Sequence, residues 1–225
     1  MGLGVATLAA CDDDDPVGTG NDDTTVRFFN ATSGGLNLDI AENGTVGTGN
    51  SAIASGSASS CTRVNAANPQ LAVRTAGSTT SLPGFAPAFS SGGTYTVLVT
   101  GTAAAPVFTM LNDQFTTPST GNAAVRIINA TTSATTGAGS YDIYVNPGAT
   151  LNTPNAVVAR NGQSNYLTVP AGQANTIRLT NTGQTTTVQN ITVPSLTAGT
   201  VTTIVIGDAV TGQTALRTFT LAACT

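Results

Sequence analysis

Short runs of alternating apolar and polar residues recur along most of the chain. In the run at 93–101, Tyr95, Val97 and Val99 fall on one face of an extended strand, and Leu98 falls with the threonines on the other. We expect strands near residues 24–31, 36–42, 60–65, 70–76, 94–100 and 106–111, and again near 123–130, 140–146, 165–169, 175–181, 185–193, 200–206 and 214–221. Glycine, asparagine and proline lie between these runs and favour turns. The pattern predicts an all-β protein with two tandem antiparallel β-sandwich domains of immunoglobulin-like type.

The two halves of the chain contain matching segments in the same order. VRFFNAT at 26–32 returns as VRIINAT at 125–131, and GTYTVLVTG at 93–101 returns as GTVTTIVIG at 199–207. A period of about 100 residues is that of a whole small domain rather than of a solenoid coil. We therefore interpret the body as a tandem duplication, with domains at 24–117 and 122–225 and the polar segment TTPSTGN between them.

Charge is scarce and unevenly placed. All seven basic residues are arginines, and six of the eleven acidic residues precede residue 24, so five acidic residues face seven arginines in the body. The net charge of −4 thus comes from the leading segment. The scattered arginines form no basic stripe, so we expect no nucleic-acid partner.

The leading segment resembles the end of a bacterial lipoprotein signal peptide. Residues 1–11 are apolar and small and end in LAAC, the pattern of the lipobox, in which the cysteine is lipidated after cleavage. The resemblance implies that Cys11 anchors the protein to a membrane, and that residues 12–23, with the run of four aspartates, are a flexible acidic tether. The expected location is the bacterial cell envelope, exported and either periplasmic or surface-exposed. The alternatives are an apolar remnant with an ordinary thiol, or an acidic cluster that binds Ca²⁺.

The second half of the chain also resembles the bacterial family of domain of unknown function 4397. The motifs that carry this resemblance are VRIINA at 125–130, DIYV at 142–145, VPAG at 169–172 and the glycine-bounded strand at 199–207. The first half matches the first and last of these motifs, but has VNAANP at 64–69 where the turn VPAG is expected. The resemblance implies secreted or cell-surface β-sandwich modules and carries over no catalytic residue.

If Cys11 is lipidated, Cys61 and Cys224 remain as a pair in an oxidising compartment. A disulfide between them would tie the C-terminus to the first domain and couple the two domains. The alternative is two separate buried thiols.

Five further residues are candidate ligand contacts. Asp39 and Asp142 occupy equivalent positions in the two halves, where a carboxylate could bind a ligand or, as we favour, accept hydrogen bonds from backbone donors at a strand end. Arg27 and Arg126 repeat likewise, so an Asp–Arg pair in each half would be a structural contact. The remaining candidates are tyrosines that could form a sugar-stacking platform, although core packing is the stronger interpretation for the first of them: Tyr141, Tyr144 and Tyr166.

The sequence offers little for catalysis. It contains no histidine and no lysine, so the usual general bases are absent, and no cysteine or histidine cluster suggests a metal. We expect no enzyme activity, no metal and no cofactor. The favoured function is a lipid-anchored envelope protein for binding or spacing at the cell surface, with an envelope polysaccharide or a surface protein as partner. The alternatives are a glycan-binding adhesin, which needs an exposed aromatic cluster, and a self-associating subunit of a surface polymer, which needs an exposed edge strand.

Overall fold

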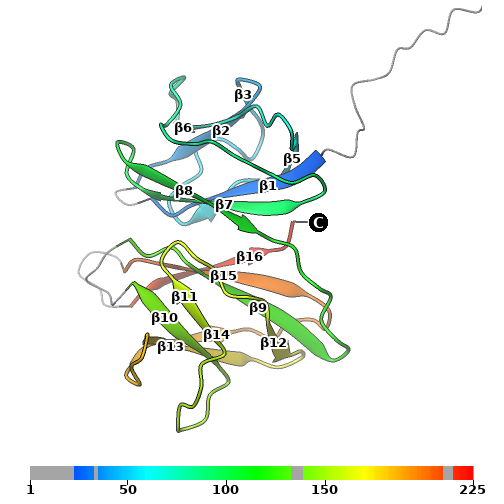
Figure 1. The fold of residues 1–225 in the computed structure, drawn as a ribbon, viewed down its shortest axis with the longest axis vertical. Coiled ribbons are helices and arrows are strands. Elements are labelled where there is room, and N and C mark those ends of the chain that lie inside the picture. Colours follow the sequence, from blue (N-terminus) through cyan, green and yellow to red (C-terminus); the bar gives the residue numbers. More distant parts are fainter. Residues whose placement is uncertain (1–22, 33–34, 133–138, 210–214, 225) are drawn as a thin grey trace, which may run out of the picture.

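The structure, a computed structural model, describes residues 23–32, 35–132, 139–209 and 215–224. In these ranges the chain forms sixteen strands and no helix, and the strands gather into four sheets (Figure 1). The predicted all-β fold with two β-sandwiches is confirmed. Thirteen strands lie within three residues of their expected bounds, and the three that the sequence analysis did not predict are short: β3 (Thr45–Val46), β4 (Ser57–Ala58) and β11 (Ala156–Ala159).

The first sandwich pairs a small outer sheet with a larger inner one. The outer sheet has the order β3-β2-β6, where β2 is Leu38–Glu42 and β6 is Leu71–Thr75. The inner sheet has the order β4-β1-β7-β8, and β5 also pairs with β1. Its longer strands are β1 (Asp23–Asn30), β5 (Thr62–Asn65), β7 (Thr94–Gly101) and β8 (Pro106–Asn112).

The second sandwich repeats this arrangement. Its inner sheet, with the order β12-β9-β15-β16, contains β9 (Asn122–Asn129), β12 (Leu167–Pro170), β15 (Val201–Gly207) and β16 (Arg217–Ala222). Its outer sheet, with the order β11-β10-β13-β14, contains β10 (Ser140–Val145), β13 (Asn175–Asn181) and β14 (Thr187–Val193). One pair in each sandwich differs from the antiparallel expectation, because β1 runs parallel to β7 and β9 runs parallel to β15. Each of these pairs joins strands that are far apart in sequence, and so the long intervening segment can make the crossover that parallel pairing requires.

The two outer sheets differ by one strand, because the first sandwich has no counterpart of β14. In the first sandwich the segment 82–90, which contains two prolines and a glycine, replaces that strand. Leu82, Phe85 and Phe89 of this segment pack against the core formed by residues such as Val26 and Phe28. Proline cannot donate to a strand ladder, and so this segment covers the core with side chains rather than with a fourth strand.

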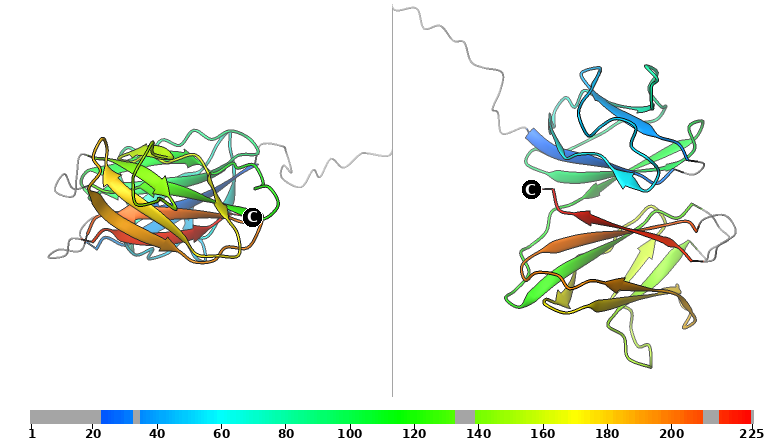
Figure 2. Two further views of the ribbon diagram at one scale, coloured as in Figure 1. Left: turned by 90° about the horizontal axis from the view of Figure 1, so that it is seen from below. Right: turned by 180° about the vertical axis from the view of Figure 1, so that it is seen from behind.

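The inner sheets of the two sandwiches pack against each other, so that the molecule is a stack of four sheets (Figures 1 and 2). Adjacent residues in the inner strands therefore face two different apolar layers. Phe28 belongs to the core of the first sandwich, whereas Phe29 belongs to the cluster between the sandwiches. That cluster contains Phe29, Leu98, Leu111, Ile128, Ala130, Val205 and Leu221. Double burial explains why the inner strands carry consecutive apolar residues.

Phe219 of β16 shows how closely the sandwiches approach. Its ring centroid lies 5.5 Å from that of Phe29 in the other sandwich. At Gly56, which has a φ of +88°, an added Cβ would lie 2.5 Å from a carbon of the same ring. Glycine at this position therefore permits both the turn and the contact between the sandwiches.

The two ends of the described chain lie at the same edge of the stack. The start of β1 and the end of β16 are neighbours in both the front and the back views (Figures 1 and 2). The connector between β8 and β9 passes the same edge, and this is where the polar residues of the interface gather.

Candidate functional site

Asp39 and Asp142 accept hydrogen bonds from backbone N–H groups of nearby turns. Asp39 accepts hydrogen bonds from the backbone N–H groups of Ala52, at 2.7 Å, and of Gly77, at 2.8 Å. Asp142 accepts one from Gly183 at 2.9 Å. Both carboxylates are buried, and the two glycines lie in the turns that follow β6 and β13. These contacts are the backbone role that the sequence analysis favoured over ligand binding.

The three candidate tyrosines do not form one platform. Tyr141 and Ile143 lie together in the hydrophobic core of the second sandwich, with 1% of the tyrosine exposed, and Tyr144 is also buried. Because their ring faces are covered, neither tyrosine can stack on a sugar. Tyr166 is partly exposed and lies at the edge where the two sandwiches meet.

Arg27 and Arg126 also depart from expectation, because Arg27 forms no ion pair with Asp39 and Arg126 forms none with Asp142. Each lies on the face of its inner sheet that is turned toward the other sandwich. Each donates through Nε to a threonine of the neighbouring parallel strand. Arg27 donates to Thr96 at 2.9 Å, and Arg126 donates to Thr203 at 3.2 Å. Parallel pairing of β1 with β7 and of β9 with β15 places these partners side by side.

Each arginine then reaches across to the other sandwich. Arg27 donates through Nη1 to the carbonyl of Ala222, and Arg126 donates through Nη1 to the carbonyl of Asn112 at 2.9 Å. Asn112 and Ala222 are equivalent positions, because β8 and β16 pair with β7 and β15 in matching register. The interface therefore has an approximate two-fold relation between the sandwiches.

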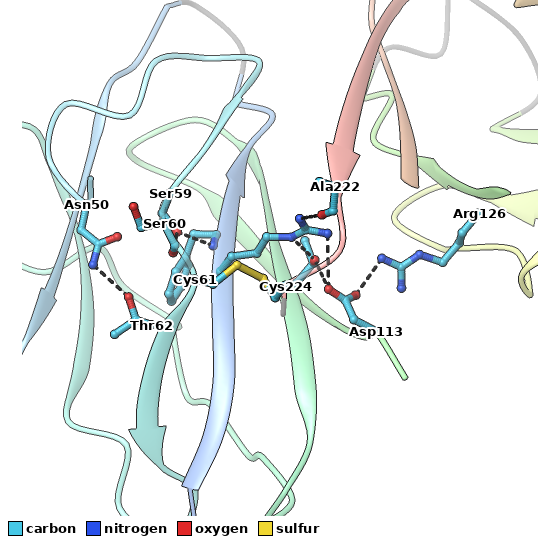
Figure 3. The surroundings of a disulfide bond; sticks show 12 residues. Asn50, Ser59, Ser60, Cys61, Thr62, Asp113, Arg126, Ala222 and Cys224 are labelled. Carbon is cyan, nitrogen blue, oxygen red and sulfur yellow. Dashed lines mark hydrogen bonds and ion pairs between the residues drawn. A yellow bond between two sulfur atoms is a disulfide. The ribbon is translucent and has the colours of Figure 1, made fainter. Parts of the chain in front are cut away.

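Asp113 breaks that symmetry. Its carboxylate lies between the two guanidinium groups, with Oδ1 2.7 Å from Nη2 of Arg126 and Oδ2 3.5 Å from Nη2 of Arg27 (Figure 3). Thr96 donates to Oδ2 at 2.6 Å. The equivalent position in the second sandwich is Ala223, so there is no matching carboxylate. We call Arg27, Arg126 and Asp113 the ion cluster.

The ion cluster is buried and carries one net positive charge. Only 5% of Arg27, 1% of Arg126 and 6% of Asp113 is exposed. Burial lowers the pKa of Arg27 from its usual value, and the attraction of Asp113 opposes this effect. Two guanidinium groups against one carboxylate thus leave an excess charge in a region of low dielectric.

The disulfide bond between Cys61 and Cys224 lies beside this cluster. It joins the residue before β5 to Cys224, two residues after the end of β16, and the two cysteines are 163 positions apart in the sequence (Figure 3). Cys61 directly precedes β5 in the way that Tyr166 directly precedes β12. The bond therefore fixes the end of the second sandwich to the first.

A groove of about 880 Å³ opens at the same edge of the interface. It is walled by the connector after β8, by Arg27 of β1 and Thr94 of β7, by the strands around Tyr166 and by the segment after β16. The groove is lined by residues of the ion cluster, the disulfide and the aromatic pair, namely Arg27, Asp113, Cys224, Phe115 and Tyr166. Its other polar side chains are those of Thr94, Gln114, Thr116, Thr117, Ser119, Thr168 and Thr203. The groove is polar for the most part, and Asp113 is the one acidic residue among its described walls.

Two aromatic rings form one side of the groove. Phe115 is 43% exposed, and its ring centroid lies 5.7 Å from that of Tyr166. The guanidinium of Arg126 packs over the ring of Tyr166, with its carbon 5.1 Å from the ring centroid, and the tyrosine hydroxyl donates to the backbone carbonyl of Asp113 at 3.2 Å. Burial raises the pKa of Tyr166 above its usual value, so the ring is neutral at ordinary pH.

The side chains that line the groove can form hydrogen bonds and stacking contacts. The acidic residue in the groove is already engaged by two arginines and a threonine, and the described walls contain no second carboxylate and no base that could activate a hydroxyl. Among the described residues, no three His, Cys, Asp or Glu side chains gather as a metal site. Hydroxyl groups, one amide and an exposed aromatic ring are groups that recognise a ligand.

Cys11 and the segments 1–11 and 12–22 lie outside the described residues, and so does Thr225. Across the ranges that are described, no helix has the length and apolar character needed to cross a bilayer.

Comparison with known proteins gives one family. The family described as Domain of unknown function (DUF4397) matches residues 24–136, which span the first sandwich, the connector and the start of the second sandwich. No curated protein matches the sequence.

Proposed function

The chain belongs to the family Domain of unknown function (DUF4397), and from this premise we propose that it is a non-enzymatic, lipid-anchored protein of the bacterial cell envelope. In this proposal the two sandwiches act as one rigid module for binding or spacing at the cell surface.

The observation that carries the proposal is the way the sandwiches are joined. Their inner sheets share an apolar cluster, the ion cluster connects them at one edge, and the Cys61–Cys224 bond closes the same edge. Domains that move independently usually meet through smaller and more polar interfaces. A disulfide is typical of an exported protein, which supports a location outside the cytoplasm.

We further propose that the two sandwiches arose by duplication of one module. The support is the repeated pairing of arginine with threonine on the face of each inner sheet that is turned toward the other sandwich, at Arg27 and Thr96 and again at Arg126 and Thr203. In a symmetric dimer the same surface patch of each subunit meets its copy. The interface within this chain has that form, as expected if two copies of a self-associating module became fused.

The proposed anchor is Cys11, and the chain offers a matched control for testing it. The word LAAC ends at Cys11 and occurs again at residues 221–224. Metabolic labelling with a fatty acid should mark the wild-type protein and the Cys224→Ser variant, and should fail to mark Cys11→Ser. Detergent partitioning should follow the same order. An unlabelled wild-type protein in a bacterial host that processes lipoproteins would reject the anchor.

A second candidate function, glycan binding at the envelope, is favoured by the groove. A glycan-binding adhesin needs an exposed aromatic cluster, and the exposed ring of Phe115 lies against the partly exposed ring of Tyr166 in a groove that is also lined by hydroxyl groups. Binding of oligosaccharides to the purified full chain, measured by calorimetry, tests this candidate independently of the anchor.

A further inference from the structure

The ion cluster has one more positive than negative charge, and it lies against the groove. A buried charge without a partner costs several kcal/mol, so a second anion near Arg27 and Arg126 would stabilise the cluster. No other acidic residue among the described walls of the groove can supply it. The remaining described carboxylates near strands are engaged elsewhere, as at Asp39 and Asp142.

Arg126 has no free donor for such an anion. Its Nε donates to Thr203, its Nη1 to Asn112 and to Gln163, and its Nη2 to Thr203 and toward Asp113. Four hydrogen bonds and the ion pair with Asp113 thus give each of the three guanidinium nitrogens a partner.

Arg27 is different, because it lines the groove and retains donor capacity. Its contacts with described residues are three: Nε with Thr96, Nη1 with Ala222 and Nη2 with Asp113, the last at 3.5 Å. Two of its five N–H groups have no acceptor in the part of the chain that the structure describes. Charge-assisted bonds from arginine to a carboxylate are stronger and shorter than bonds between neutral groups.

The rest of the groove suits a sugar. Phe115 exposes part of an aromatic ring, a group that packs against the C–H face of a pyranose, and the ring of Tyr166 lies against it at an interplanar angle of 59°. Side-chain hydroxyls and the amide of Gln114 also line the groove and can exchange hydrogen bonds with sugar hydroxyls. A single excess charge matches a singly charged carboxylate better than it matches a chain of phosphates.

We infer that the groove between the two sandwiches binds a carboxylate-bearing saccharide, with the sugar carboxylate at Arg27 and a pyranose ring against Phe115. This inference rests on the proposed role of the chain as a binding module of the envelope, and it adds the chemical class of the ligand. The juxtaposition that carries it is an arginine with spare donors, a buried excess charge and an exposed aromatic ring in one groove.

The test is calorimetric titration of the full chain with trigalacturonate, triguluronate and triglucuronate, in parallel with the methyl ester of trigalacturonate and with a neutral trigalactose. At least one of the three acidic sugars should bind, its affinity should fall as salt rises, and the ester and the neutral sugar should bind about tenfold more weakly or worse.

Three variants locate the site. Phe115→Ala removes an exposed ring and should weaken binding about tenfold while the unfolding midpoint stays unchanged. Arg27→Lys keeps the charge but loses the fork of donors, and should weaken binding of the acidic sugar more than that of the neutral one. Val157→Ala, an exposed change on β11, should have no effect.

The outcomes distinguish recognition of the carboxylate from binding of a glycan as such. Equal binding of the ester and the acid would overturn the carboxylate inference and leave glycan binding standing. Binding of neither class, or binding that Phe115→Ala leaves intact, would overturn the inference at this groove. The lipid-labelling result for Cys11 is independent of all these outcomes.

Discussion

The carboxylate of Asp113 lies 2.7 Å from the guanidinium of Arg126, and this ion pair joins the connector of the first sandwich to the first strand of the second. Arg27 approaches the same carboxylate from the other side, at 3.5 Å. The charge balance of the interface therefore depends on a single acidic residue. Its removal should be more damaging than the removal of an ordinary surface carboxylate.

Asp113→Asn should lower the free energy of unfolding by about 3–5 kcal/mol, because it leaves two buried guanidinium groups without a carboxylate. Equilibrium denaturation in urea, with the disulfide intact, measures the change. Glu42→Gln is the matched control, since Glu42 is partly exposed on β2 and its change should stay within about 0.5 kcal/mol. A loss in Asp113→Asn no larger than in the control would show that the ion cluster does not hold the interface.

The disulfide closes a loop of 163 residues, so it should constrain the unfolded chain strongly. The double variant Cys61→Ser/Cys224→Ser should lose about 3–5 kcal/mol of unfolding free energy. Peptide mapping of the oxidised wild-type protein by mass spectrometry should give one fragment pair that contains both cysteines. Two thiols that react with an alkylating agent in the folded, exported protein would contradict this bond.

Leu98 tests the apolar part of the interface. It is fully buried between the sandwiches, so Leu98→Ala should cost about 2–5 kcal/mol of unfolding free energy. Val157→Ala, at a side chain that is 54% exposed, should change the same quantity by less than about 0.5 kcal/mol. If the two variants lose equally little, the inner sheets do not pack together in solution.

Asp39 and Asp142 test the prediction that the protein is not an enzyme. We expect no hydrolysis of glycan, peptide or ester substrates, because each carboxylate is bound to backbone N–H groups rather than to a second acid or base. Asp39→Asn should instead lower stability by about 1–3 kcal/mol, since the amide can no longer accept both bonds. Reproducible turnover that disappears in either Asn variant would mean that a catalytic carboxylate was mistaken for a turn residue.

The strands themselves could be predicted from the sequence because alternation and turn residues are local signals. Short strands escaped prediction: β3 and β4 have two residues each, too few to show a period. The family was also predicted from sequence motifs and is confirmed. More of these motifs occur in the second half of the chain, whereas the family match lies mainly over the first half.

The stacking of the sandwiches was visible in the sequence but had no unique interpretation. Phe28 and Phe29 are adjacent, as are Ile127 and Ile128, and such pairs point to both faces of a strand. In a strand with one solvent face, the second residue of each pair would be exposed. In the structure the inner sheet of the other sandwich covers this second residue. No local sequence pattern identifies that sheet as the packing partner.

The candidate site was harder to predict, because it is assembled from distant segments. Asp113 and Arg27 are 86 residues apart in the sequence. Asp39 and Asp142 became candidates because they match between the two halves, whereas Asp113 has no counterpart in the second half and was not selected in this way. Phe115 lies in the connector, outside every predicted strand. An unrepeated acidic residue beside a domain boundary was the one available signal.

The central claim is that the two sandwiches form one rigid body. Spin labels at Thr79 and Thr185, two exposed positions in equivalent turns of the outer sheets, measure it most directly, provided that they are attached through non-natural amino acids so that the disulfide remains. Pulsed electron-spin distance measurements should give a single narrow distribution centred on the separation in the stacked structure. A broad distribution, or a main peak at another separation in the oxidised wild-type background, would contradict the claim.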